Sequence, residues 1–195
     1  MKTEGLSNRQ FETNSDVITR WLVDPAHSEF LFKVKHMMIS TVTGRFERFG
    51  ATVETVGDDF TNADISVEVE VDSIQTNNPD RDSHLKSDDF FNAESFPRIT
   101  FRSSSFDGER LTGDLTIRDI TREVTLQVES SGTAVDPYGQ TKAGFELTGE
   151  ISRKEFGLKW DVVTEAGSVV VSDKVKLIID IQFIRQDEES PGNRF

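Results

Sequence analysis

The chain has 195 residues and a formal net charge of −13 at pH 7, with a sequence pI of about 4.7. This length favours a single domain with a substantial core, and the negative charge argues against nucleic-acid partners and against general attraction to an anionic membrane. The absence of cysteine excludes disulfide scaffolds and thiolate metal sites. The 15 phenylalanines, beside one tyrosine, suit a dry interior or a lipid-lined cavity.

The two ends of the chain differ from its middle. Residues 1–19 are polar and aperiodic, and residues 186–195 are charged and contain Pro-Gly, so we expect both to be disordered extensions of one folded domain at 20–185. The first residues do not resemble a secretory signal, and no uncharged apolar run approaches the roughly 18 residues of a spanning helix. We therefore expect a cytoplasmic protein without stable membrane insertion.

Alternation of apolar and polar residues dominates the predicted domain and is typical of half-buried antiparallel strands. Turn residues at 57–58, 107–108, 137–139 and 166–167 separate the alternating segments. Roughly eight strands predict an all-β barrel or sandwich. The apolar positions of these segments, in chain order, are Phe30, Phe32, Val34, Ile65, Val67, Val69, Val71, Leu111, Leu115, Ile117, Val124, Leu126, Val128, Phe145, Leu147, Ile151, Val175, Leu177, Ile179, Ile181 and Phe183.

Helix is expected only between residues 80 and 91. Ser87, followed by Asp88 and Asp89, has the features of an N-cap with an acidic first turn, so we predict a short helix that carries Phe90 and Phe91. Residues 80–86 could form another turn. A barrel of about eight strands is either filled by its own side chains or open for one small ligand, and the strand pattern leaves both alternatives open.

Four stretches of the chain, between Trp21 and about Phe183, resemble the YceI-like family of polyisoprenoid-binding proteins. They are residues 21–53, 71–103, 111–126 and 151–160. The residues that carry the resemblance are His27, Ser28, His36, Gly44, Phe46, Ser73, Thr76, Arg81, Asp82, His84, Leu85, Phe90, Pro97, Phe101, Gly113, Leu115, Thr116, Thr121, Arg153, Phe156 and Gly157. Their order and content, more than any single motif, are typical of the family.

The resemblance implies an extended lipocalin-like antiparallel β-barrel with one or two short helices. Its interior would hold a long-chain isoprenoid, such as a polyprenyl diphosphate or an isoprenoid quinone, or a related amphipathic lipid, for transport, storage or protection. It implies a non-catalytic homodimer with no cofactor besides this ligand. From the strand phase and the resemblance we predict an apolar lining and a polar head-group end. The lining is Phe30, Phe32, Val34, Phe46, Phe90, Phe101, Phe145 and Trp160, and the polar end is Arg81, His84 and Arg153.

Four alternatives compete with this interpretation. The histidines lack the paired short spacing of a zinc site, so we predict no metal site. A hydrolase would use His84 as base, Asp82, Asp88 or Asp89 as its helper and Ser83 or Ser87 as nucleophile, but neighbouring residues rarely have the required geometry. Arg81 could be held in a structural loop by Asp82 or Asp72 instead of binding a diphosphate, so a neutral head group is also possible. A ligand-free structural or stress-response interaction module fits a filled barrel.

Overall fold

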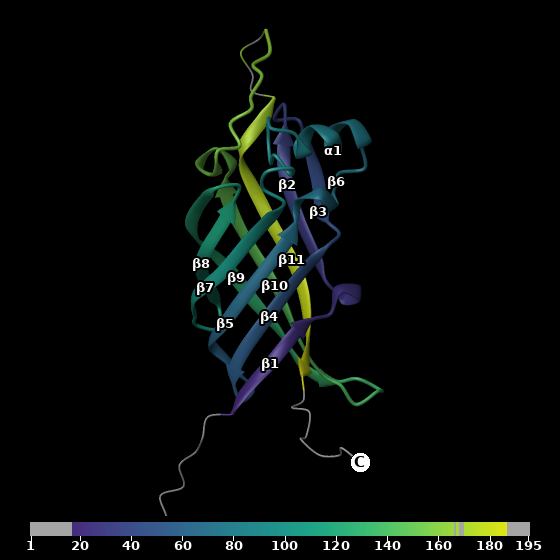
Figure 1. Cartoon of the computed structure of the whole chain (residues 1–195), viewed down its shortest axis with the longest axis vertical. Coiled ribbons are helices and arrows are strands. Elements are labelled where there is room, and N and C mark those ends of the chain that lie inside the picture. The colour runs from purple at the N-terminus through teal and green to yellow at the C-terminus, as the bar shows by residue number, and fades with distance from the viewer. Residues whose placement is uncertain (1–16, 166, 168–169, 187–195) are drawn as a thin grey trace, which may run out of the picture.

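The computed structural model describes residues 17–165, 167 and 170–186. Its strands form one antiparallel sheet in the order β1-β4-β5-β7-β8-β9-β10-β11-β2-β3-β6, and an additional pairing of β1 with β11 closes the first eight into a barrel. The predicted barrel of about eight strands is thus confirmed (Figure 1). The strands are β1 Ile18–Val23, β2 Glu29–His36, β3 Ser40–Phe46, β4 Phe49–Val56, β5 Asp59–Glu70, β6 Ile74–Gln75, β7 Arg98–Phe106, β8 Arg110–Ile117, β9 Ile120–Val135, β10 Thr141–Ser152 and β11 Val171–Gln186.

Strand β11 belongs to the closed barrel and also carries the strands outside it, β2, β3 and β6. Its last residues, Phe183–Gln186, pair with β1, whereas its residues 171–180 pair with β2. Between β1 and β2 the chain forms the short 3-10 segment η1, Pro25–His27. The β2–β3 hairpin, with β6 on its outer edge, therefore prolongs the wall of the barrel beyond β1 and β4. In Figure 1 this extension points to the same end as α1.

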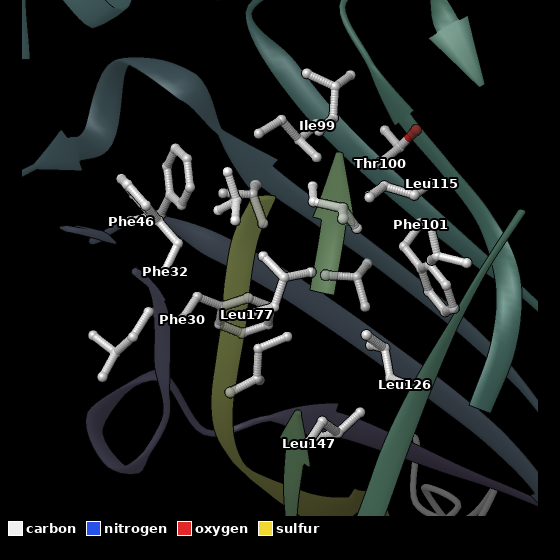
Figure 2. A pocket seen from close by; sticks show the side chains of 18 of the residues that line it. Phe30, Phe32, Phe46, Ile99, Thr100, Phe101, Leu115, Leu126, Leu147 and Leu177 are labelled. Atoms are coloured by element: carbon white, nitrogen blue, oxygen red, sulfur yellow. The ribbon is translucent and has the colours of Figure 1, made fainter. Parts of the chain in front are cut away.

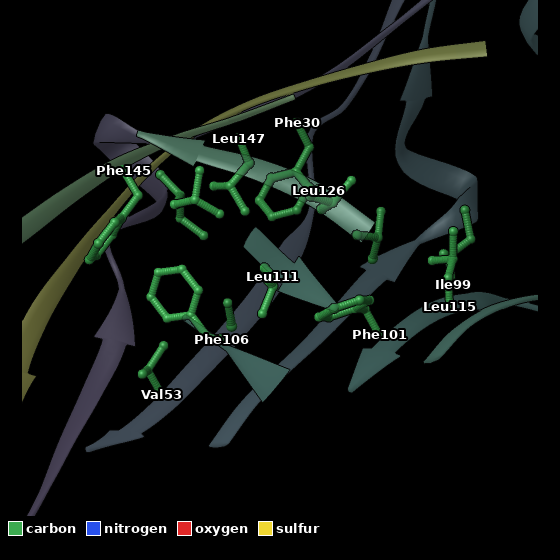
Figure 3. Packing of buried hydrophobic residues seen from close by; sticks show 14 of the residues in the cluster. Phe30, Val53, Ile99, Phe101, Phe106, Leu111, Leu115, Leu126, Phe145 and Leu147 are labelled. Carbon is green, nitrogen blue, oxygen red and sulfur yellow. The ribbon is translucent and has the colours of Figure 1, made fainter. Parts of the chain in front are cut away.

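The predicted strand phase matches the structure. Because side chains alternate between the two faces of a strand, one set of alternate positions faces the barrel interior. The interior core combines these positions with further aromatic residues, and Figure 3 shows Phe101, Phe106, Leu126, Phe145 and Leu147 gathered in it. Val71 is the exception to the strand pattern, since it lies buried in the 3-10 segment η2, Val71–Ser73.

The helix lies where the sequence allowed a second turn, at residues 80–86, and the helix predicted to start at Ser87 was wrong. Helix α1 spans Pro79–Lys86, with Asn78 as N-cap accepting a hydrogen bond from the backbone N–H of Arg81 (3.0 Å). Ser87 ends this helix instead of starting one, and Phe90 and Phe91 lie in the turns that follow. The Asn-Pro pair explains the shift, because an Asn cap followed by proline at the first helical position is the stronger start signal.

The limits of the domain extend slightly beyond the prediction. β1 begins at Ile18 and β11 ends at Gln186, so paired strands reach past both ends of the 20–185 range. Most of the two predicted extensions, residues 1–16 and 187–195, and Ala166 of one predicted turn lie outside the described residues. Among the described residues, no helix is both long enough and apolar enough to cross a bilayer.

Candidate ligand-binding site

A cavity of about 230 Å³ lies inside the barrel. Of the 34 residues that line it, only Thr100 and Arg153 have polar side chains. Figure 2 shows Phe32 and Phe46 on one side of the space and Phe101 and Leu126 on the other. The described barrel is therefore not completely filled by its own side chains. A wall of this composition offers water almost no hydrogen bonds and suits a hydrocarbon ligand.

The strand pattern accounts for most of the cavity wall. On β11 every second residue from Val175 to Phe183 lines the cavity, and so do the alternate apolar positions predicted on β2, β5, β8, β9 and β10, although the glycines between them, Gly113 and Gly149, do not. All the apolar strand positions named from the sequence line the cavity except Val71. The period-2 rule thus places the face of each strand correctly, because every one of these strands turns one face to the barrel interior.

Seven of the eight predicted lining residues border the cavity, namely Phe30, Phe32, Val34, Phe46, Phe90, Phe101 and Phe145. Trp160 is not among the lining residues. Its ring packs against Phe90, with ring centroids 5.3 Å apart, and against His84 at 4.9 Å. Trp160 therefore supports the cavity wall from behind Phe90.

The sequence prediction missed lining residues from irregular segments. Phe60, Phe91 and Leu158 lie in or beside turns, where no alternation marks the inward face, and all three line the cavity. Phe106 also lines it, at the end of β7. For the three phenylalanines among these residues, the sequence signal is the excess of phenylalanine over tyrosine, since Phe has no polar tip to direct toward water.

An aromatic cluster closes the end of the cavity farthest from α1. Trp21 is completely buried and its ring centroid lies 4.9 Å from that of Phe60, which contacts Phe145 at the same distance. The Trp21 indole N–H donates a hydrogen bond to the hydroxyl of Thr55 (3.1 Å), so its polar atom is satisfied. We call Trp21, Phe60 and Phe145 the aromatic floor of the cavity. The opposite end of the cavity lies near α1.

Arg81 and Asp82 hold α1 in place at that other end. Asp82 is buried and accepts hydrogen bonds from the backbone N–H (2.9 Å) and the hydroxyl of Thr76. Arg81 donates from Nε to the Thr76 hydroxyl (2.8 Å) and from Nη2 to the Thr76 carbonyl (2.7 Å). The two neighbouring charged residues therefore share one partner, and neither Arg81 nor Asp82 lines the cavity.

His84 pairs with one of the carboxylates that the hydrolase interpretation offers, but the Ser87 hydroxyl does not contact its ring. Its Nε2 lies 2.8 Å from a carboxylate oxygen of Asp89, not of Asp82. The Ser87 hydroxyl donates to the backbone carbonyl of His84 (2.7 Å) instead of the imidazole. Within the described part of the chain, no group of three or more His, Asp or Glu side chains is placed to hold a metal ion. His84 packs edge-on against Phe90 and thus lies one layer outside the cavity.

Arg153 is the one charged residue in the cavity wall. It is 3% exposed and begins the 3-10 segment η3, Arg153–Phe156. Its guanidinium donates to the backbone carbonyls of Ser172 (2.9 Å), Leu158 (2.6 Å), Trp160 (2.8 Å) and Val171 (3.1 Å). Burial lowers the pKa of this guanidinium below its usual value, against the opposing effect of nearby carboxylates. Four of its five N–H groups are thus engaged in holding the chain on both sides of residues 161–170.

Comparisons with known proteins agree with this geometry. The model of the YceI-like domain family matches residues 21–183. A UPF0312 protein of Staphylococcus aureus (strain COL) is 37% identical over 167 residues, which cover 85% of this chain and 98% of that protein. The crystal structure of a Campylobacter jejuni YceI protein is 27% identical, with a TM-score of 0.65, and the match covers 96% of this chain and all of that one.

Two more distant structures share the fold. Burkholderia cenocepacia BcnA has a TM-score of 0.68 at 23% identity, with coverage of 82% of this chain and 98% of BcnA. A polyisoprenoid binding domain from Saccharophagus degradans has a TM-score of 0.64 at 14% identity, with coverage of 85% and 98%. Because the family model spans nearly the whole barrel and a relative above one-third identity covers most of the chain, the chain belongs to the YceI-like family.

Proposed function

We propose that the protein binds a long-chain isoprenoid or a related amphipathic lipid in the barrel cavity and performs no chemistry on it. The observation that carries this proposal is the cavity wall, in which 32 of 34 residues are apolar. Each CH2 group moved from water into such a space contributes about 0.8 kcal/mol. The polyisoprenoid binding domain of Saccharophagus degradans, which has the same fold, makes an isoprenoid the first class of ligand to test.

The size of the cavity limits how such a ligand binds. Its volume of about 230 Å³ lies slightly below the roughly 300–1,000 Å³ of pockets that enclose drug-sized ligands. A long prenyl chain therefore needs rearrangement of the phenylalanine side chains, or part of the chain extends beyond the cavity. Phe32, Phe46 and Phe91 are only partly buried, so they are the side chains best able to move.

Recognition in this proposal depends on the hydrocarbon chain more than on the head group. Arg153 already donates four of its five N–H groups to backbone carbonyls, Arg81 donates two of its five to Thr76, and His84 is paired with Asp89. A diphosphate at the α1 end would have to compete with these contacts. We therefore favour a neutral head group, such as that of an isoprenoid quinone, and a role in transport, storage or protection of the lipid.

Mass spectrometry of the purified protein tests the proposal. Native and denaturing spectra are compared, and the organic-extractable fraction released on unfolding is identified; the same protein is then incubated with isoprenoid quinones and polyprenyl diphosphates. We expect one lipid per barrel, with quinone bound more tightly than diphosphate. A protein that is purified empty and takes up neither compound would overturn the proposal. Sedimentation velocity on the same sample tests the homodimer that the family resemblance implies.

Two adjacent isoleucines on β11 provide a matched pair of variants. Ile179 lines the cavity, whereas Ile178 does not, and both are partly buried. Ile179→Asn places a polar group in the cavity, and Ile179→Phe fills part of it without adding polarity. We expect both variants to lose lipid while Ile178→Asn and Ile178→Phe retain it. Equal retention by all four variants would show that the ligand does not occupy the cavity.

A further inference from the structure

The turn between β2 and β3 combines backbone strain with exposed apolar side chains. The backbone N–H of Ile39 donates to the carbonyl of His36 (3.2 Å), which makes a β-turn with Met37 and Met38 at its centre, within the three-residue connection between β2 and β3. Both methionines have left-handed backbone angles, with φ of +50° and +59°. Asn and Gly adopt this conformation at far lower cost, and they are the usual residues of such turns. The backbone conformation of the turn therefore does not explain why methionine occupies these two positions.

The side chains at this turn project into solvent. Met38 is 67% exposed and Ile39 is 82% exposed. The Met37 N–H donates to the carbonyl of Val170 (2.8 Å), and the Val170 N–H donates to the carbonyl of Val162 (3.0 Å). These bonds bring the exposed Val162 and Val163 to the same end of the barrel as the turn. We call the five exposed apolar residues, Met37, Met38, Ile39, Val162 and Val163, the apolar tip.

The strands that carry the apolar tip, β2 and β3, are basic in an otherwise acidic protein, apart from Glu29 at the start of β2. From Phe30 to Phe46 the sequence contains Lys33, Lys35 and Arg45 and no acidic residue, against a net charge of −13 for the chain. Lys33 and Lys35 are exposed, and neither forms an ion pair with another described residue. Their neighbours Phe32 and Val34 line the cavity, so the lysines point outward.

The apolar tip adjoins the cavity. Val34 and Val171 line the cavity, and Val171 pairs with His36, the residue before Met37. Figure 1 shows the β2–β3 turn at the α1 end of the barrel, opposite the aromatic floor. A surface that contacts the apolar tip is therefore close to the cavity end that the floor does not close.

We propose that the apolar tip docks reversibly onto a lipid bilayer that contains anionic phospholipid. Flexible methionine side chains adapt to the irregular surface between head groups and acyl chains, while Lys33 and Lys35 contact the lipid phosphates. A second copy of this chain would fit less well, because it would present the same basic strands to Lys33 and Lys35. The overall negative charge opposes approach at long range, but at physiological salt only charges within about 8 Å act strongly.

Docking in this position would let an apolar ligand pass between the bilayer and the cavity without crossing water. In that respect the inference deepens the proposed function and depends on it. The docking itself does not require a ligand, so the two proposals can fail separately. Glu165, an exposed carboxylate beside Val163 on the neighbouring segment, is placed to limit the affinity and keep the contact reversible.

Vesicle co-sedimentation of the full-length protein tests the docking. Vesicles of phosphatidylcholine mixed with phosphatidylglycerol are compared with vesicles of phosphatidylcholine alone. We expect binding to the mixed vesicles that weakens with added salt. The double variant Met37→Asn/Met38→Gly, which gives the turn its preferred residues, should fold at least as stably and bind about tenfold less. Lys33→Gln/Lys35→Gln should lose the preference for phosphatidylglycerol.

The opposite end of the barrel supplies the control. Val135 and Tyr138, at the β9–β10 connection, are also exposed and apolar or aromatic, and Val135→Asn/Tyr138→Asn should bind vesicles like the unchanged protein. Absence of wild-type binding, or equal binding by Met37→Asn/Met38→Gly, would overturn the inference. So would a wild-type dimer in sedimentation that this variant abolishes, because the tip would then join two chains.

One further measurement separates this inference from the proposed function. Ligand is offered in detergent micelles, where no bilayer is needed. If both proposals hold, Met37→Asn/Met38→Gly takes up ligand normally, whereas Ile179→Asn does not take it up but still binds vesicles. If wild-type protein binds vesicles but accepts no ligand, the proposed function fails and the docking stands. If it accepts ligand but binds no vesicle, the docking fails alone.

Discussion

The ring of Phe32 occupies the space in which a side chain at Gly44 would stand. The two residues lie directly opposite each other on β2 and β3, and a Cβ atom added to Gly44 would overlap three carbons of the Phe32 ring. Glycine at this position is therefore required for close approach of an aromatic side chain, not for an unusual backbone angle. Phe32 in turn forms part of the cavity wall (Figure 2).

We predict that Gly44→Ala lowers both stability and ligand capacity. The added methyl group forces the Phe32 ring toward the cavity, and such overpacking costs about 1–3 kcal/mol. Thermal unfolding and the lipid content of the purified protein measure the two effects. Gly50→Ala is the control, since a Cβ atom there meets nothing within 4 Å. Adding Phe32→Leu to Gly44→Ala should recover stability; if it does not, the overlap is not the cause.

Arg153→Met should loosen the chain on both sides of residues 161–170. The substitution leaves four backbone carbonyls without their charged donor, and hydrogen bonds to charged groups contribute about 1.5–3 kcal/mol each. We expect a loss of at least about 3 kcal/mol in urea denaturation and faster amide exchange near Leu158 and Val171. Lys154→Met, which removes an exposed ion pair, should change stability by about 1 kcal/mol or less. Similar losses for the two variants would contradict this role.

Asp24 should contribute to stability in a pH-dependent way. Burial alone raises the pKa of its carboxyl, but hydrogen bonds from His27, Lys142 and the backbone N–H of Ala26 outweigh burial, so the pKa lies below its ordinary value of 3.8. Because the folded-state pKa is the lower one, this contribution is complete above pH 3.8 and is lost as the pH falls further. Asp24→Asn should therefore destabilise the protein at neutral pH and progressively less in acid. Urea denaturation from pH 7 to acid measures this, with the exposed Asp114→Asn as control.

Thr76→Val should release α1 from the barrel. The Thr76 hydroxyl donates to Asp82 and accepts from Arg81, so its loss leaves a buried carboxylate short of one donor. We expect a cost of about 1–3 kcal/mol and faster amide exchange in Pro79–Lys86. Thr148→Val, on the exposed face of β10, is the control. Unchanged exchange in α1 would show that the cavity-facing contact of Leu85 is sufficient to hold the helix.

For the polar residues near α1, the sequence indicated which residue types lie at the site but not which of them contact each other. The sequence left Asp82, Asp88 and Asp89 as possible partners of His84; in the structure His84 pairs with Asp89, while Asp82 accepts hydrogen bonds from Thr76. All three carboxylates lie within a few residues of His84, so spacing does not distinguish between them. The choice depends on the start of α1 at Pro79, which turns Asp82 toward the barrel and leaves His84 near Asp89. The residue at which the helix begins therefore decides which partners Asp82 and His84 contact.

Most of the barrel strands, and the apolar face of each, could be predicted from the alternation of residue types along the chain. This information is local, because alternate side chains of a strand lie on opposite sides and one barrel interior collects all the apolar faces. The folded barrel was needed to show that the interior keeps a cavity, that Trp160 packs behind Phe90, and that Arg153 donates to backbone carbonyls. Each of these outcomes depends on volumes and partners contributed by strands and loops far apart in the chain, which no local pattern encodes.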